Sequence, residues 1–303
     1  MDKRYYISRF VKIGEIEGEE VLNAISEPEV IRRGKYNFTF IDYNYIENVL
    51  ENDFVFARMA KFSPEDEIEH VDLDSNTSTA ERESNVLHAV SPFIYVPRLD
   101  GIAYQHIWNK LERNQFNLAF EDLILEKYDG LMYDVSVKAV TNMKTFVERV
   151  STLSRIIEMN ATVNPPNPWF GPAWESLRDY MASRDVDSMR VEEKNTGDGS
   201  INTNIPQIAG IINNNDQINE DRLEDLLEPY DTGISDAAIL MAADGYGDAK
   251  ILGFRNQDQV VVKTSENQVS FNYDDDPDPI ELAREAISIL EDIEENRHLE
   301  DGE

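Results

Sequence analysis

Asp244 and Asp248 are the two carboxylates whose spacing comes closest to a metal-binding pattern. They flank two glycines in the segment Asp244-Gly245-Tyr246-Gly247-Asp248, and glycines let a backbone turn tightly enough for two carboxylates to converge on a divalent cation. The same pattern is typical of a glycine turn that leads into a strand, and oxygen-rich metal loops usually supply more ligands than this. We favour the turn, and we keep a metal-dependent nuclease or phosphodiesterase as the alternative.

Other familiar catalytic patterns are missing from the sequence. The four histidines, His70, His88, His106 and His298, have no pair at the i, i+3 or i, i+4 spacing of a helical zinc site. With no cysteine in the chain, disulfides, thiolate zinc sites and cysteine nucleophiles are excluded. There is also no nucleophile elbow and no glycine-rich phosphate loop. The sequence therefore predicts no cofactor and leaves any catalytic residue unknown.

The segment 164–174 has the most distinctive composition in the chain. It combines four prolines with Trp169, Phe170 and Trp174, so it should form a stiff apolar loop. These rings either pack inward against a sheet or form an aromatic surface that binds a protein, because rigid exposed aromatics are favoured anchors at interfaces. Trp169 is the expected anchor, since it directly follows Pro168 at the apex of the loop.

Several of these residues carry a resemblance to a known family. A strand ending in Asn164-Pro165, a helix led by Trp174, and the run Ala242-Ala243-Asp244-Gly245-Tyr246-Gly247 together resemble an uncharacterised prokaryotic domain of unknown function over roughly residues 132–273. The resemblance implies a genomic setting, in phage-defence or mobile-element loci. It implies no reaction and no catalytic residue.

The chain carries 60 acidic and 28 basic residues, a net charge of -32. Residues 274–303 hold 13 acidic and 2 basic residues, so most of the excess is spread along the rest of the chain. Such a surface repels itself until molar salt shortens the Debye length to about 3 Å, which favours a halophile's cytoplasm. An acidic DNA mimic is the alternative. Lysines and arginines are not clustered along the sequence, which argues against direct nucleic-acid binding, and no apolar run is long enough for a membrane helix.

Aromatic and β-branched residues with partial alternation predict strands at residues 5–13, 36–43, 53–62 and 86–96. Between the last two strands, residues 63–84 lose the apolar pattern and are expected to form a mobile surface loop. A helix is predicted over 106–126. The strand, helix and strand expected over 132–163 suggest one sheet with a helix on its face.

After the proline loop, apolar runs at 249–254, 259–263 and 269–273 predict a three-stranded antiparallel meander, and a C-terminal acidic helix follows at 279–295. The predicted fold class is α+β. The expected domains are an N-terminal mixed α+β domain over 1–168, a smaller α+β region over 169–295, and an acidic tail over 296–303.

Three function hypotheses follow. The first is an accessory, non-enzymatic component of a halophile's antiviral-defence or mobile-element system that acts through a protein partner in the cytoplasm. The second is the metal-dependent nuclease or phosphodiesterase, and the third is the DNA mimic. The sequence does not specify the oligomeric state or the identity of the partner.

Overall fold

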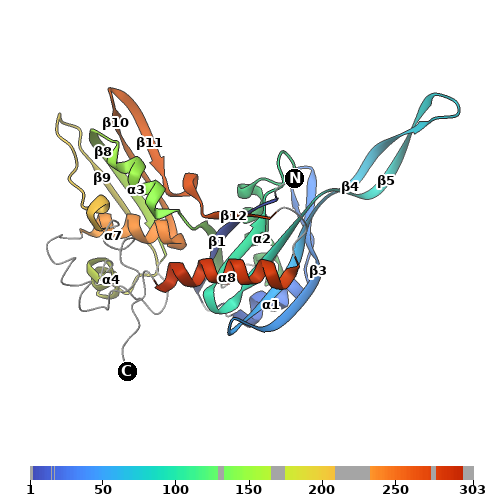
Figure 1. Cartoon of the computed structure of the whole chain (residues 1–303), viewed down its shortest axis with the longest axis horizontal. Coiled ribbons are helices and arrows are strands. Elements are labelled where there is room, and N and C mark those ends of the chain that lie inside the picture. Colours follow the sequence, from blue (N-terminus) through green and yellow to red (C-terminus); the bar gives the residue numbers. More distant parts are fainter. Residues whose placement is uncertain are drawn as a thin grey trace.

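The computed structural model describes residues 3–14, 16, 18–128, 133–164, 175–208, 233–273 and 278–295. These residues form two antiparallel sheets, one larger and one smaller, with helices packed on them (Figure 1). The predicted α+β class is confirmed. No helix in this part of the chain is long and apolar enough to cross a membrane.

The larger sheet has the strand order β12-β1-β6-β5-β4-β3-β2, and β7 pairs with the second half of β1. All of its pairings are antiparallel. The strands are β1 (Lys3–Gly14), β2 (Ile31–Arg33), β3 (Tyr36–Val49), β4 (Asn52–Asp72), β5 (Thr77–Val96), β6 (Gly101–Gln105), β7 (Tyr133–Ala139) and β12 (Ser270–Tyr273).

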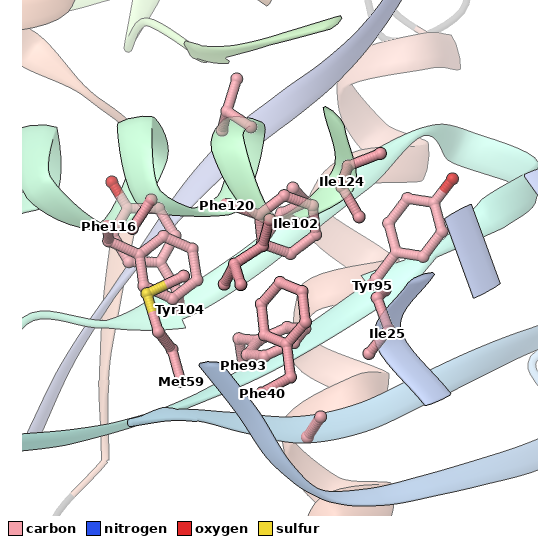
Figure 2. Packing of buried hydrophobic residues seen from close by; sticks show 14 of the residues in the cluster. Ile25, Phe40, Met59, Phe93, Tyr95, Ile102, Tyr104, Phe116, Phe120 and Ile124 are labelled. Carbon is pink, nitrogen blue, oxygen red and sulfur yellow. The ribbon is translucent and has the colours of Figure 1, made fainter. Parts of the chain in front are cut away.

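One face of this sheet is covered by α1 (Gly18–Ser26) and α2 (Arg113–Lys127). Between α2 and the sheet lies a cluster of aromatic rings (Figure 2). The Tyr104 and Phe116 rings stack in parallel with centroids 4.0 Å apart, and Phe120 meets Phe93 edge to face at 5.5 Å. Buried aromatics of this kind contribute both apolar area and ring contacts, so this cluster is the main core of the larger sheet.

The opposite face is covered by α8 (Pro279–Glu295), which the sequence predicted with the same bounds. Leu282, Ala286 and Leu290 are fully buried against the sheet. At Gly101 a Cβ atom would lie 2.2 Å from Leu290 Cδ1, so the helix rests on a strand position without a side chain.

The smaller sheet has the order β11-β10-β8-β9. Its helical cover comes from α3 and α7, and its apolar core includes Phe146, Met159 and Ile251. The elements of this half are α3 (Met143–Ser151), β8 (Arg155–Val163), α4 (Glu175–Ala182), β9 (Met189–Lys194), α7 (Ile234–Met241), the π-helical turn η3 (Ala242–Tyr246), β10 (Gly247–Arg255) and β11 (Asp258–Lys263).

The expectation that the strand, helix and strand over 132–163 share one sheet is wrong. β7 pairs with β1 in the larger sheet, whereas β8 pairs with β9 and β10 in the smaller one. The three strands predicted at 249–254, 259–263 and 269–273 are all present. β10 and β11 form a hairpin in the smaller sheet, and β12 pairs with β1 in the larger sheet. β8 and β10 pair, so segments on either side of residue 168 share a sheet. The domain boundary expected at residue 168 stays a prediction.

Arg9 lies where the two sheets meet. Its side chain is buried, and its guanidinium donates to the carbonyl oxygens of Leu99 at 3.1 Å and Asp244 at 3.2 Å. The same group lies over the Tyr246 ring, 4.6 Å from its centroid. Gly245 has φ +90°, and a Cβ there would lie 2.9 Å from Arg9 Cβ, so this glycine allows the approach. β1 and η3 are therefore joined through a buried cation.

Candidate functional site

The most unusual surface feature is a two-stranded ribbon that extends far beyond the body of the protein (Figure 1). It consists of residues 65–84, the distal halves of β4 and β5 with the turn between them, and we call it the acidic ribbon. Pairing is in register from Glu65 opposite Ser84 to Asp72 opposite Thr77. Eight residues per strand correspond to a length of about 26 Å.

The expected mobile loop over 63–84 is therefore wrong. Threonines and polar side chains suit a strand that has water on both faces. Such a strand has no alternating apolar residues, so the apolar pattern used to predict the other strands does not reveal it. The sequence did indicate the turn of this hairpin, because Asp74, Ser75 and Asn76 are residues typical of turns. Asn76 adopts φ 51°, which asparagine tolerates better than most residues.

Charge dominates the acidic ribbon. It contains eight carboxylates and one arginine, for a net charge of -7. Asp66 lies opposite Glu83, a like-charge cross-strand pair that destabilises pairing, while Glu67 lies opposite Arg82. Nearly all of its described side chains are exposed on both faces of the ribbon, so the carboxylates create a strongly negative surface on both sides.

Histidines link the two strands of the acidic ribbon and its base. At the base, His88 Nε2 lies 2.6 Å from Ser63 Oγ and 3.2 Å from an oxygen of Asp66. Further out, His70 Nε2 lies 3.4 Å from a Glu83 oxygen. Ser63 and Asp66 both contact Nε2 of His88. In a hydrolase triad the serine and the aspartate contact different nitrogens of the histidine ring, so these three residues do not have the geometry of a triad. These contacts hold the strands together.

Two apolar residues lie at the tip of the acidic ribbon among acidic and polar neighbours. Leu73 is 82% exposed and Val71 is 71% exposed, the two highest values among the large hydrophobic residues that the structure describes. An isolated two-stranded hairpin is only marginally stable in water. A ribbon that carries leucine and valine at its exposed end therefore has the features of an element that gains stability when a partner covers it.

The structure places the two candidate metal ligands in different environments. Asp244 is buried in η3, next to Arg9 at the junction of the sheets. Asp248 lies on β10 with its side chain 61% exposed, and it forms an ion pair with Lys138 at 2.7 Å. In the described part of the chain, no three histidine, aspartate or glutamate side chains are grouped as metal ligands would be.

We expect magnesium or manganese at millimolar concentration to raise the thermal midpoint no more than potassium chloride of equal ionic strength does. The reason is that Asp248 is already neutralised by Lys138 and faces water. Thermal unfolding followed by circular dichroism measures this. A metal-specific rise that disappears in Asp244→Asn would contradict the expectation and favour a phosphodiesterase.

The three aromatic residues predicted to bind protein, Trp169, Phe170 and Trp174, lie outside the described residues. Their role as an anchor stays a prediction. Sequence reasoning overlooked Leu73 and Val71, and also Trp108, which is 68% exposed. Single apolar residues inside polar segments carry no periodic signal, so only their exposure in the fold marks them.

A comparison with models of protein families gives a match over most of the chain. A model of the family described as "Domain of unknown function (DUF4747)" matches residues 19–215. The chain belongs to the DUF4747 family. The match confirms an uncharacterised domain family and begins well before residue 132, where the expected resemblance started. No curated protein matches the chain. The matched region contains the whole acidic ribbon, so the ribbon lies within the family domain.

Proposed function

We propose that this DUF4747 protein is a non-enzymatic accessory protein that acts through protein contacts, and that the acidic ribbon is the element its partner binds. The observation that carries the proposal is the ribbon itself: a paired segment about 26 Å long with both faces exposed and no contribution to either core. Ordering such a segment costs conformational entropy that burial within the chain does not offset. A partner that covers the ribbon would supply the missing burial.

The chemistry of the acidic ribbon defines the partner. Eight carboxylates require a basic surface, and the exposed side chains of Leu73 and Val71 require an apolar depression at its end. Screening in concentrated salt weakens the charge contacts but not the apolar ones. In a saline cytoplasm, the tip would therefore provide most of the affinity, and the carboxylates would exclude partners without a basic surface.

The setting that we propose is the cytoplasm of a halophile, in an antiviral-defence or mobile-element system. The acidity spread along the whole chain supports the saline cytoplasm. The resemblance at residues 132–273 supports the genomic setting.

Replacing Leu73 with serine is expected to weaken partner binding at least tenfold, because burial of a leucine side chain contributes about 1.5–3 kcal/mol. Proteins that co-purify with the full chain from its native host in molar salt are identified first. Each is then purified and its affinity for the wild type and for Leu73→Ser is measured directly by calorimetry.

The matched control is Val30→Ser, which changes another exposed apolar residue, 53% exposed, outside the acidic ribbon. It should bind like the wild type. The proposal is wrong if every purified partner binds Leu73→Ser and a chain with residues 65–84 replaced by Asn-Gly as tightly as the wild type. If binding depends on the carboxylates alone and DNA displaces the partner, the DNA mimic becomes the better explanation.

A further inference from the structure

Trp108 stands on a tight turn between β6 and α2, away from the acidic ribbon's tip. The turn is closed by the bridge between Ile107 and Leu111, and it leaves the Trp108 side chain 68% exposed. The indole contacts the His106 ring at a tilt of 38°, with centroids 4.5 Å apart. His106 is buried, so the tryptophan rests on a fixed base.

Hydrogen bonds make this turn rigid. His106 Nε2 lies 2.6 Å from Glu112 Oε2, and the Asn109 backbone N–H donates to Glu112 Oε1 at 2.9 Å. Desolvation raises the pKa of Glu112, but these hydrogen bonds and the nearby charges of His106 and Arg113 outweigh it and the pKa is lowered. Glu112 therefore stays ionised and holds the turn from both sides.

Cations from separate parts of the chain lie over Tyr6, whose ring contacts the same histidine as Trp108 does. Arg113 lies over the Tyr6 ring at 4.7 Å and Arg4 lies over the same ring at 5.2 Å, while Tyr6 contacts His106 at 5.7 Å. Lys110 is exposed on the turn itself. We call this surface the basic aromatic patch; it comprises Arg4, Tyr6, Trp108, Lys110 and Arg113.

This gathering stands out against the charge of the chain. Many of the cations that the structure describes are neutralised by carboxylates, for example Lys138 by Asp248 and Arg149 by Glu266. Within the described residues, Arg4, Lys110 and Arg113 form no ion pair; Arg113 donates instead to Gln268, and Arg4 to Ser270. Arg113 also attracts the ionised Glu112, although the two form no ion pair. Cations that lie over Tyr6, close to an exposed indole, are suited to an anion that also has an aromatic face.

We propose that the basic aromatic patch binds single-stranded nucleic acid, with a base stacked on Trp108 and phosphates against Arg4, Lys110 and Arg113. An exposed aromatic beside cations is the usual way in which unpaired strands are bound without sequence preference. A duplex hides its base faces, so it could not use the indole. The sequence argued against direct nucleic-acid binding because its lysines and arginines are not clustered along the chain. The fold changes this expectation because it brings Arg4 and Arg113, which are far apart in the sequence, to the same ring.

The remaining charge of the protein sets the conditions of the measurement. A chain of net charge -32 repels a polyanion at long range, whereas stacking does not depend on charge. Near 0.5–1 M potassium chloride, distant carboxylates are screened, because the Debye length there is only about 3–5 Å. Three phosphate contacts on a single strand give a slope of about -2 in the logarithm of affinity against the logarithm of salt.

Fluorescence anisotropy of labelled fifteen-nucleotide oligo(dT) and oligo(U), titrated with the full-length protein in this salt range, tests the proposal. Trp108→Ala is expected to weaken binding about tenfold, the effect of losing one stacked base, while Trp108→Phe keeps most of the affinity. Arg113→Gln should reduce the salt slope by about 0.7. A duplex of the same length should bind more weakly than either strand.

Arg82→Gln, which removes the only arginine of the acidic ribbon, is the matched control and should leave strand affinity unchanged. Binding that is equal in wild type and Trp108→Ala overturns the proposal, as does an absence of binding by a folded wild type. Stronger competition by poly-glutamate than by oligo(dT) would overturn it too, and would make an acidic protein segment the occupant. These results do not depend on Leu73, so they are separate from the test of the acidic ribbon.

Discussion

Gly247→Ala is expected to destabilise the protein severely. A Cβ atom at this position would lie 2.1 Å from the backbone oxygen of Thr162 and 3.0 Å from Val163 Cα. Both neighbours are backbone atoms of β8, which pairs with β10 at this point, so neither can move without breaking the ladder. We expect a loss of about 3 kcal/mol or more, equivalent to a fall in the thermal midpoint of roughly 5–10 °C.

Gly197→Ala is the matched control for this change. Its added Cβ would meet only the Asn195 side chain, at 3.5 Å, which is an ordinary contact. Differential scanning calorimetry of the two variants should show a shift within about 0.5 kcal/mol for the control. Equal midpoints for Gly247→Ala and Gly197→Ala would mean that β8 and β10 do not approach as closely as the structure shows.

Stability should rise strongly with salt. With 60 acidic and 28 basic residues, the folded chain concentrates negative charge that the unfolded chain spreads out. Raising potassium chloride from about 0.1 M to 2 M should increase the thermal midpoint by roughly 5–10 °C, because the Debye length falls from about 10 Å to below 3 Å. Melting curves across a potassium chloride series measure this effect.

A charge variant separates screening from the general strengthening of apolar burial by salt. Glu281 and Glu285 are exposed one turn apart on α8, where like charges repel. The double variant Glu281→Gln, Glu285→Gln should melt higher than the wild type at 0.1 M and at nearly the same temperature at 2 M. A constant difference across the series, or a flat wild-type curve, would count against the halophile hypothesis.

Local pattern was enough to predict most individual elements. α8 has the predicted bounds because its apolar residues recur with the period of a helix, and a proline opens it. The α+β class followed from the helix and strand periods along the chain. The glycine segment was correctly expected to lead into a strand, β10, since Gly247 is its first residue.

The acidic ribbon could not be predicted by the same reasoning. Apolar periodicity reports a strand only where one face is buried, and residues 65–84 bury neither face. Their order depends on cross-strand hydrogen bonds that begin at the buried part of β4 and continue outward. Leu73 and Val71 gained meaning only when the fold placed them at the exposed end.

The sequence by itself determined the strong acidity and the lack of cysteine chemistry through its composition, and the types of the main elements through its local pattern, because each depends on residue identity or on near neighbours. Tertiary structure alone decided which strands pair, since β7 and β8 carry similar apolar patterns but join different sheets. It also brought Arg4 and Arg113 over the Tyr6 ring and placed Asp244 and Asp248 in unlike surroundings. Contacts between distant segments depend on the packing of the whole chain, and no local spacing encodes them.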